Sequence, residues 1–128
     1  MNATTTYCQT SPIIAPRRIQ RVRHVKGWRK PEGAVDCTRH KGGKWGNDYE
    51  IRCVNKKMDM YYVVSIKTFY SSTIMSKRDA AAHAVQMFTD IQLPGMDCEP
   101  LRGKTLMCWC ALDMSCHVDS ILRKANGW

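Results

Sequence analysis

The feature that most constrains this chain is a nearly continuous apolar run, from Thr105 to Cys110, that ends in two closely spaced thiols. A run of this length and character predicts a strand covered on both faces. Cys116 and His117 follow a few residues later, where a helical pattern begins. Junctions between a strand and the next helix are where α/β proteins usually bind their ligands. We therefore expect the functional site at this junction.

One helix is expected on each side of this strand in the sequence. The first begins at Ser76, with Asp79 three residues later as a variant capping box, and Pro94-Gly95 ends it. The second begins near Ser115 and ends at Asn126-Gly127. The predicted buried faces are Ala81, Ala84, Val85, Phe88 and Ile91 in the first helix and Val118, Ile121, Leu122 and Ala125 in the second.

The first half of the chain is typical of strands joined by a long connection. Residues 49–54 and 60–66, with a polar turn between them, predict a hairpin, because the second arm is rich in β-branched and aromatic residues. Residues 18–25 suit a short strand at a sheet edge, although a helical turn fits almost as well. Residues 26–48 are rich in glycine and predict a long basic loop. The fold class is therefore α/β or α+β: a small mixed sheet with two main helices and this loop.

The length of 128 residues allows one domain with a single core. Residues 1–16 are polar and Thr-rich, which predicts a disordered N-terminal tail, and residues 17–128 are expected to form the domain. Seven cysteines, an odd number, together with an N-terminus unlike a signal peptide, indicate a reducing, cytoplasmic location. No apolar run approaches the length needed to cross a bilayer, so no membrane-spanning role is expected.

The positive charge is concentrated in one part of the sequence. The formal net charge is +9, and residues 17–44 contain ten basic residues against two acidic ones. A nucleic acid, a nucleotide phosphate or an acidic protein is the natural partner of such a segment. The alternative is a solvated basic face that only keeps the protein soluble.

Cys108, Cys110, Cys116 and His117 are candidate metal ligands, because zinc prefers thiolate and imidazole. Cys108 and Cys110 are two apart on a strand, so their side chains point to the same side. No Cys-x-x-Cys pair is present, which argues against a simple zinc knuckle. Adjacent Cys116 and His117 on a helix would splay by about 100°. A four-ligand site is therefore expected to be strained, and zinc is only one candidate cofactor.

Cys110, Cys116, His117 and Asp119 are also candidate catalytic residues. A helix N-terminus lowers the pKa of a thiol and attracts anions, and Asp113 or Asp119 is available to orient the imidazole. Such an arrangement suits nucleophilic or general-base chemistry, or the binding of a phosphate. The alternative is that the thiols are buried small hydrophobic groups, which is the preferred interpretation for Cys108.

The long loop and the approach to the apolar run carry the candidate ligand-binding residues. These are Trp28, Arg29, Lys44, Trp45, Gly46, Asn47, Arg102 and Lys104. In the segment 44–47 a lysine can pair with phosphate, an indole can stack, an amide can pair with a base or ribose edge, and a glycine allows close approach. The alternative is that the two tryptophans pin a long loop to the core.

Several motifs, taken in order, resemble those of an uncharacterised family of phage and bacterial proteins known as domain of unknown function 4326. They are Arg21-Val22-Arg23, Lys26-Gly27-Trp28-Arg29, Lys44-Trp45-Gly46-Asn47, Leu101-Arg102-Gly103-Lys104, Cys108-Trp109-Cys110 and Cys116-His117-Val118-Asp119-Ser120-Ile121-Leu122. Asp48 stands where the family usually has proline, so that loop is expected to turn differently. The resemblance implies a compact intracellular domain that is common in phage genomes, and it brings no established activity.

These observations predict a small phage-type domain, in the host cytoplasm if phage-encoded, that binds a nucleotide or nucleic acid. Lys44, Trp45 and Asn47 are expected to hold the base and sugar, and the helix start at Cys116 and His117 the phosphate. A nucleotide-acting hydrolase or transferase fits the same pattern. The alternative is non-enzymatic: a zinc-stabilised nucleic-acid-binding protein or a phage inhibitor of a host factor. The main hypothesis requires the segment 44–47 to lie against the late thiols and imidazole.

Overall fold

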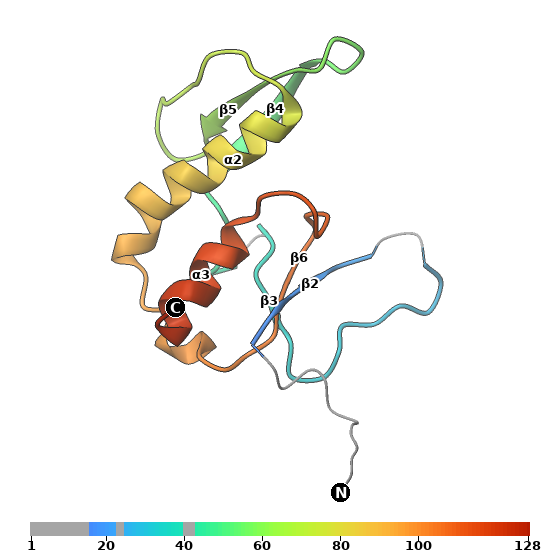
Figure 1. Ribbon diagram of the computed structural model, residues 1–128, viewed down its shortest axis with the longest axis vertical. Coiled ribbons are helices and arrows are strands. Elements are labelled where there is room, and N and C mark those ends of the chain that lie inside the picture. The colour runs from blue at the N-terminus through green and yellow to red at the C-terminus, as the bar shows by residue number, and fades with distance from the viewer. Residues whose placement is uncertain (1–15, 23–24, 40–42) are drawn as a thin grey trace, which may run out of the picture.

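A parallel three-stranded sheet occupies the lower part of the computed structural model, which describes residues 16–22, 25–39 and 43–128 (Figure 1). Its strands are β2 (Arg18–Gln20), β6 (Leu106–Cys108) and β3 (Val35–Asp36), in that order across the sheet. The central strand β6 pairs in parallel with both neighbours, and all three of its side chains are buried. The predicted strand covered on both faces is thus confirmed, and so is the predicted edge strand near residue 18. The tail predicted for residues 1–16 lies almost wholly outside the described residues.

The predicted hairpin forms a second sheet. β4 (Tyr49–Asn55) and β5 (Met60–Ser65) pair antiparallel, with a register shift between Cys53 and Asn55. The strands therefore divide between one parallel and one antiparallel sheet instead of forming one mixed sheet. The hairpin lies at the top of Figure 1, and helix α2 packs against it.

Helix α2 (Lys77–Met87) begins where the sequence predicts, because the Ser76 hydroxyl accepts a hydrogen bond from the Asp79 amide at 3.1 Å. It continues into a π-helical turn, η2 (Phe88–Gln92), and a 3₁₀ turn, η3 (Leu93–Gly95). Phe88 is buried as predicted, but the prediction for Ile91 is wrong, since its side chain is 58% exposed. The π turn has more residues than an α turn, so it rotates Ile91 away from the buried face.

Helix α3 (His117–Asn126) follows β6 and covers the parallel sheet. Its predicted buried face of Val118, Ile121, Leu122 and Ala125 is confirmed. Gly127 ends the helix with φ +72°, a left-handed conformation that glycine adopts without steric cost. Cys116 is the N-cap residue, with the extended backbone angles φ −145° and ψ 141°. A further 3₁₀ turn, η4 (Glu99–Leu101), precedes β6 and contacts α3.

One apolar core joins the two sheets. Phe88 from η2, Ile121 from α3, Leu106 from β6 and Val63 from β5 are fully buried and belong to the same cluster. The domain is thus a mixed α/β fold with two main helices, as the sequence predicted. The short strand β3 within the long loop was not predicted, because two residues carry no periodicity. Among the described residues, no helix is both long and apolar enough to cross a membrane.

Candidate metal centre and adjoining pocket

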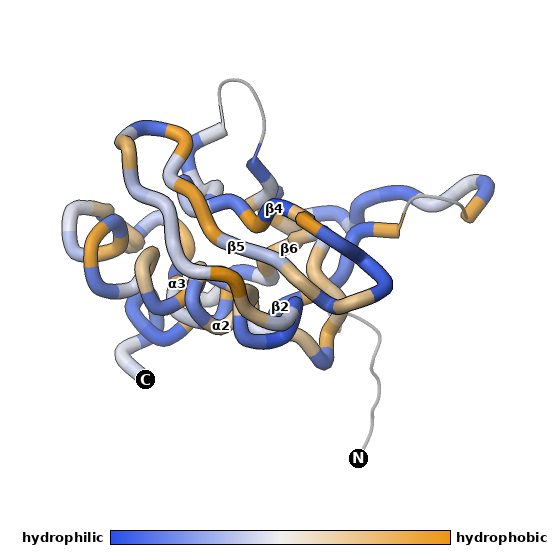
Figure 2. The backbone as a smooth tube through the Cα atoms, turned by 90° about the horizontal axis from the view of Figure 1, so that it is seen from above, coloured by the Kyte–Doolittle hydropathy of each residue, from blue (hydrophilic) through white to orange (hydrophobic). Residues whose placement is uncertain are grey.

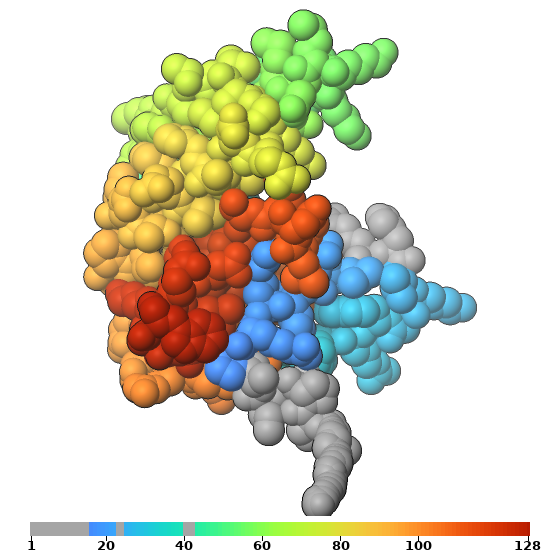
Figure 3. Space-filling model, viewed as in Figure 1, coloured from blue at the N-terminus to red at the C-terminus, as the bar shows by residue number. Residues whose placement is uncertain are grey.

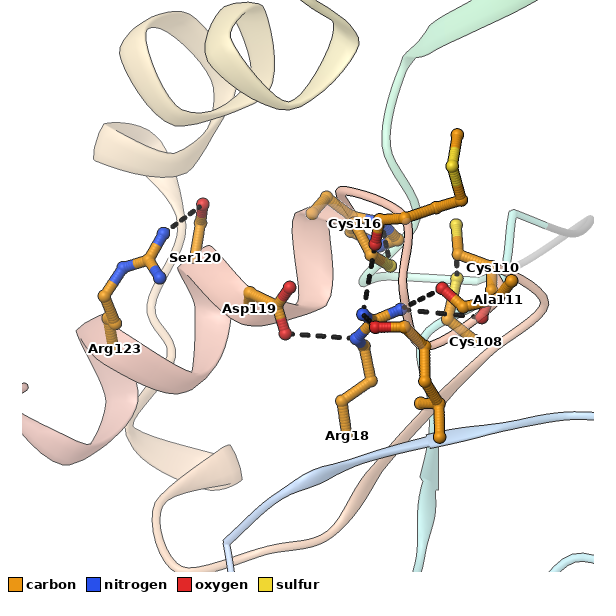
Figure 4. A network of polar contacts seen from close by, with 11 residues as sticks. Arg18, Cys108, Cys110, Ala111, Cys116, Asp119, Ser120 and Arg123 are labelled. Atoms are coloured by element: carbon orange, nitrogen blue, oxygen red, sulfur yellow. Dashed lines mark hydrogen bonds and ion pairs between the residues drawn. The ribbon is translucent and has the colours of Figure 1, made fainter. Parts of the chain in front are cut away.

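Three thiols converge at the carboxyl end of β6. Cys108 ends the strand, Cys110 lies in the loop that follows, and Cys116 caps α3. Their three Sγ atoms all lie within 4.8 Å of one another, and those of Cys108 and Cys110 are 3.7 Å apart (Figure 4). Cys108 and Cys116 are buried, and Cys110 is half-buried. Within the described residues this cluster could hold a metal ion, because thiolates are strong ligands for soft and borderline metals.

The protonation states of the three thiols depend on one another. Hydrogen bonding with Cys110 and Cys116 holds the pKa of Cys108 well below its usual range. The same contact with Cys108 raises the pKa of Cys110 to about 11 and is also the main cause that raises the pKa of Cys116. The three thiols therefore titrate as one coupled group, in which a lowered pKa at one sulfur goes with raised pKa values at the other two. A bound cation would have to displace the remaining protons.

His117 lies beside the thiols and is held by backbone carbonyls. Its Nε2 is 2.8 Å from the Trp45 oxygen and 3.0 Å from the Cys37 oxygen, and its ring packs edge-on against Phe88. Its Nδ1 is 3.8 Å from the Cys116 Sγ. The expected splay of about 100° between Cys116 and His117 assumed that both residues are helical, but Cys116 is the N-cap residue and has extended backbone angles.

The carboxylate expected to orient this imidazole has another partner. Asp119 pairs with the Arg18 guanidinium at 3.0 Å, and Asp113 is exposed. The imidazole is oriented by two carbonyls instead of a carboxylate. The four candidate catalytic residues therefore do not form a nucleophile–base–carboxylate chain, although Cys110, Cys116 and His117 lie together.

Arg18 holds the loop between the thiols and was not predicted as part of the site. Its guanidinium donates hydrogen bonds to the carbonyl oxygens of Cys110, Ala111, Leu112 and Met114 at 3.0–3.5 Å (Figure 4). The Arg18 side chain is only 8% exposed. Nothing in the sequence distinguishes this arginine from the others near it, because its partners lie more than 90 residues away. Its position on β2, next to β6, is what brings it to the loop.

The segment 44–47 folds against the thiol-rich end of the sheet through its backbone, but Lys44 and Trp45 do not line the pocket beside the thiols, so they do not form the shared cleft that the main hypothesis required. The Trp45 carbonyl accepts from His117, and Lys44 Nζ lies 5.3 Å from the Trp45 ring centre. Gly46 is needed here, since a Cβ at this position would lie 2.8 Å from the Arg39 Cα. The buried Asn47 amide bonds to the Ala84 carbonyl and the Tyr49 amide. The polar groups expected to bind a base are thus used to fix the segment in place.

A pocket of about 280 Å³ opens beside the thiols. It is lined by Cys108, Trp109, Cys110, Ser115, Cys116, His117, Thr38, Arg39, Asn47, Tyr49, Glu50, Ile51, Ala81, Ala84 and Val85. Arg39 and Trp109 are lining residues that the sequence did not single out. Trp28 and Arg29 lie in the loop 25–34, and Arg102 and Lys104 are exposed at the turn before β6, at the opposite end of that strand from the thiols.

The fold and the site define a small α/β domain with a thiol cluster at the end of its central parallel strand. The chain belongs to the family described as Domain of unknown function (DUF4326), whose model matches residues 20–127. This confirms the family resemblance that the ordered motifs indicated. No curated protein and no solved structure matches the chain.

Proposed function

We propose that this protein is a zinc-stabilised domain that binds a nucleic acid or nucleotide at the pocket beside the thiol cluster. The observation that carries the proposal is the composition of this pocket, which combines Arg39, Trp109, whose ring centre lies 4.7 Å from the Arg21 guanidinium, and three clustered thiols. A cation and an aromatic surface are the groups that bind the phosphate and base of a nucleotide. The volume of about 280 Å³ suits a single nucleotide unit better than a larger ligand.

Zinc is the metal that the donor set favours. Three sulfur atoms and a nearby imidazole match the ligands of structural zinc sites, and oxygen ligands, which magnesium and calcium need, are missing from the clustered group of the described residues. The cluster joins the end of β6 to the start of α3. A bound zinc ion would therefore stabilise the loop that forms one wall of the pocket.

The charge distribution supports an extended anionic partner. The loop 25–34 exposes Lys26, Arg29 and Lys30, and the hairpin tip exposes Lys56 and Lys57. Figures 1 and 2 show both segments extending on the same side of the molecule, and the outline in Figure 3 is hollowed between them. A strand of nucleic acid lying across this side could contact both basic segments at once.

The test is a titration of a fluorescently labelled single-stranded oligonucleotide, followed by anisotropy at several salt concentrations. We expect the double variant Arg29→Ala/Lys30→Ala to weaken binding and to reduce the slope of log K against log salt by about 1.4, which is two lost contacts at about 0.7 each. The matched control is Arg102→Ala/Lys104→Ala, which removes the same charge at the far end of β6. Equal losses for the two variants would contradict a localised binding surface.

Two further measurements complete the test. If a mononucleotide displaces the oligonucleotide, the pocket binds a nucleotide unit. If only longer polymers displace it, the contacts lie in the basic segments and not in the pocket. Metal content of the purified protein, measured by native mass spectrometry, should give one zinc ion per chain. The variant Cys110→Ser should lose it, while Cys53→Ser, which changes an exposed cysteine on β4, should keep it.

A further inference from the structure

The ring of His117 has one nitrogen whose protonation the structure determines. Nε2 lies within hydrogen-bond distance of two carbonyl oxygens, those of Trp45 at 2.8 Å and Cys37 at 3.0 Å. A carbonyl oxygen can only accept, so Nε2 must carry a proton. In the neutral ring the lone pair is then on Nδ1. This is the arrangement found in metal-binding histidines, where the nitrogen that does not bind the metal donates to a carbonyl or carboxylate.

The Nδ1 atom is directed toward the thiols. It lies 3.8 Å from the Cys116 Sγ, and the imidazole also interacts with the Cys108 thiol. The ring is buried and wedged edge-on against Phe88, with ring centres 5.1 Å apart. Its position is therefore fixed by packing and by both carbonyls, independently of any metal.

Two of the six ligand separations can be compared directly with those of a tetrahedral site. With Zn–S bonds of about 2.3 Å and Zn–N bonds of about 2.0 Å, neighbouring sulfur atoms lie about 3.8 Å apart and sulfur and nitrogen about 3.6 Å. The observed separations are 3.7 Å between the Cys108 and Cys110 sulfurs and 3.8 Å between Cys116 Sγ and His117 Nδ1. His117 lies outside the group of thiols whose ligand atoms are all within 4.8 Å of one another, so a metal would have to draw the imidazole and Cys108 or Cys110 closer together. We infer that His117 Nδ1 is the fourth ligand of a closed centre with three sulfur atoms and one nitrogen.

Arg18 completes this centre from outside. Three thiolates, one neutral imidazole and Zn²⁺ carry a net charge of −1, and burying that charge needs compensation. The buried Arg18 guanidinium, whose charge is shared with its ion-pair partner Asp119, lies beside Cys110 and bonds the four carbonyls of the loop that joins Cys110 to Cys116. Arg18 is thus a positioning residue that holds two ligands at the right separation.

This inference rests on the proposed zinc binding and assigns the metal a structural role. A catalytic zinc keeps one coordination position for water or substrate, whereas a structural zinc has four protein ligands. With His117 bound, the ion has no position left for a ligand in the pocket. A nucleotide in the pocket would then contact Arg39 and Trp109 and not the metal.

The decisive experiment is X-ray absorption at the zinc edge on the wild-type protein. We expect three sulfur neighbours and one nitrogen with the outer-shell pattern of an imidazole. In the cobalt-substituted protein, added cyanide or free imidazole should leave the visible absorption unchanged, because no coordination position is open. A shell with three sulfurs and one oxygen, together with a spectrum that responds to added cyanide, would overturn the inference while leaving zinc binding intact. A protein that binds no metal would contradict the proposed function as well.

A histidine variant gives an independent readout. His117→Ala should lower zinc affinity by at least tenfold and turn the cobalt spectrum into one that responds to added imidazole. His83→Ala, which removes a half-buried imidazole bonded to Tyr70, is the matched control and should change neither property. If His117→Ala fails to fold, nitrogen-15 shifts of the wild-type ring still decide the question. Nδ1 should then show the shift of a metal-bound nitrogen, and the shift of a free nitrogen would refute the assignment.

Discussion

Replacing Arg18 by glutamine removes a side chain that joins β2 to the loop between the thiols. The substitution deletes an ion pair with Asp119 and the hydrogen bonds to four loop carbonyls. A glutamine amide can reach at most one or two of these acceptors. The remaining carbonyls either turn toward water or stay buried without a donor, and both outcomes loosen the loop that carries Cys110.

The size of the effect follows from the exposure of each partner. The Asp119 side chain is 41% exposed and the hydrogen bond to the Leu112 carbonyl is at the surface, so water can replace much of the hydrogen bonding that these two groups lose. The Ala111 and Met114 carbonyls are partly buried and bonded at 3.2 and 3.1 Å, and each bond from a charged donor is worth about 1–2 kcal/mol. We therefore expect Arg18→Gln to lower the free energy of unfolding by about 2–4 kcal/mol.

The assay is urea denaturation of the metal-free protein, followed by competition with a chromogenic chelator for zinc. Zinc affinity should fall 10- to 100-fold, as is usual when a group that orients metal ligands is removed. Arg123→Gln is the matched control, because Arg123 is exposed and donates one bond, at 3.3 Å, to the Ser120 hydroxyl. Equal stability and equal zinc affinity for the two variants would show that the loop does not depend on Arg18.

Three further predictions concern the framework of the site. Gly46→Ala should cost about 1–3 kcal/mol in thermal or urea unfolding, because the added Cβ would lie 2.8 Å from a neighbouring backbone carbon; an unchanged midpoint would contradict the close approach. At pH 8, iodoacetamide should label the exposed Cys53 and leave Cys37 unlabelled in mass spectra of the native protein, since burial raises the pKa of Cys37 to about 12 and the thiol stays protonated far below that pH; labelling of Cys37 as fast as Cys53 would refute this. Phe88→Ala should cost about 3–5 kcal/mol and Ile91→Ala less than about 1, and similar losses for both would mean that Ile91 faces the core as regular helical spacing predicts.

The elements with strong local signals could be predicted from the sequence. Ser76 marks the start of α2 because its side chain accepts a hydrogen bond from an amide three residues later. Gly127 marks the end of α3 because glycine adopts the left-handed conformation found there. The apolar run that contains β6 predicted a buried strand, because a strand covered on both faces has apolar residues at nearly every position. The hairpin followed from β-branched and aromatic residues with a polar turn between them.

What the sequence could not predict depends on contacts between distant segments. Cys116 was placed on a helix, whereas it is the N-cap residue with an extended backbone, and its Sγ lies 3.8 Å from the His117 Nδ1. Asn47 was expected to bind a ligand, yet its amide satisfies buried backbone groups on β4 and α2. Arg18 was one basic residue among many, and only its pairing partner β6 reveals its role.

The order in which β2, β6 and β3 lie side by side has a consequence for synthesis on the ribosome. The middle strand is the last of the three to be made, so neither early strand has a neighbour to pair with until residue 106 has emerged. The ion pair between Arg18 and Asp119 can form only later still, because Asp119 is 101 positions downstream of Arg18. The thiol cluster therefore assembles only after residue 116 has emerged, and until then the nascent chain exposes unpaired strands that a chaperone can bind and free thiols that can form a premature disulfide.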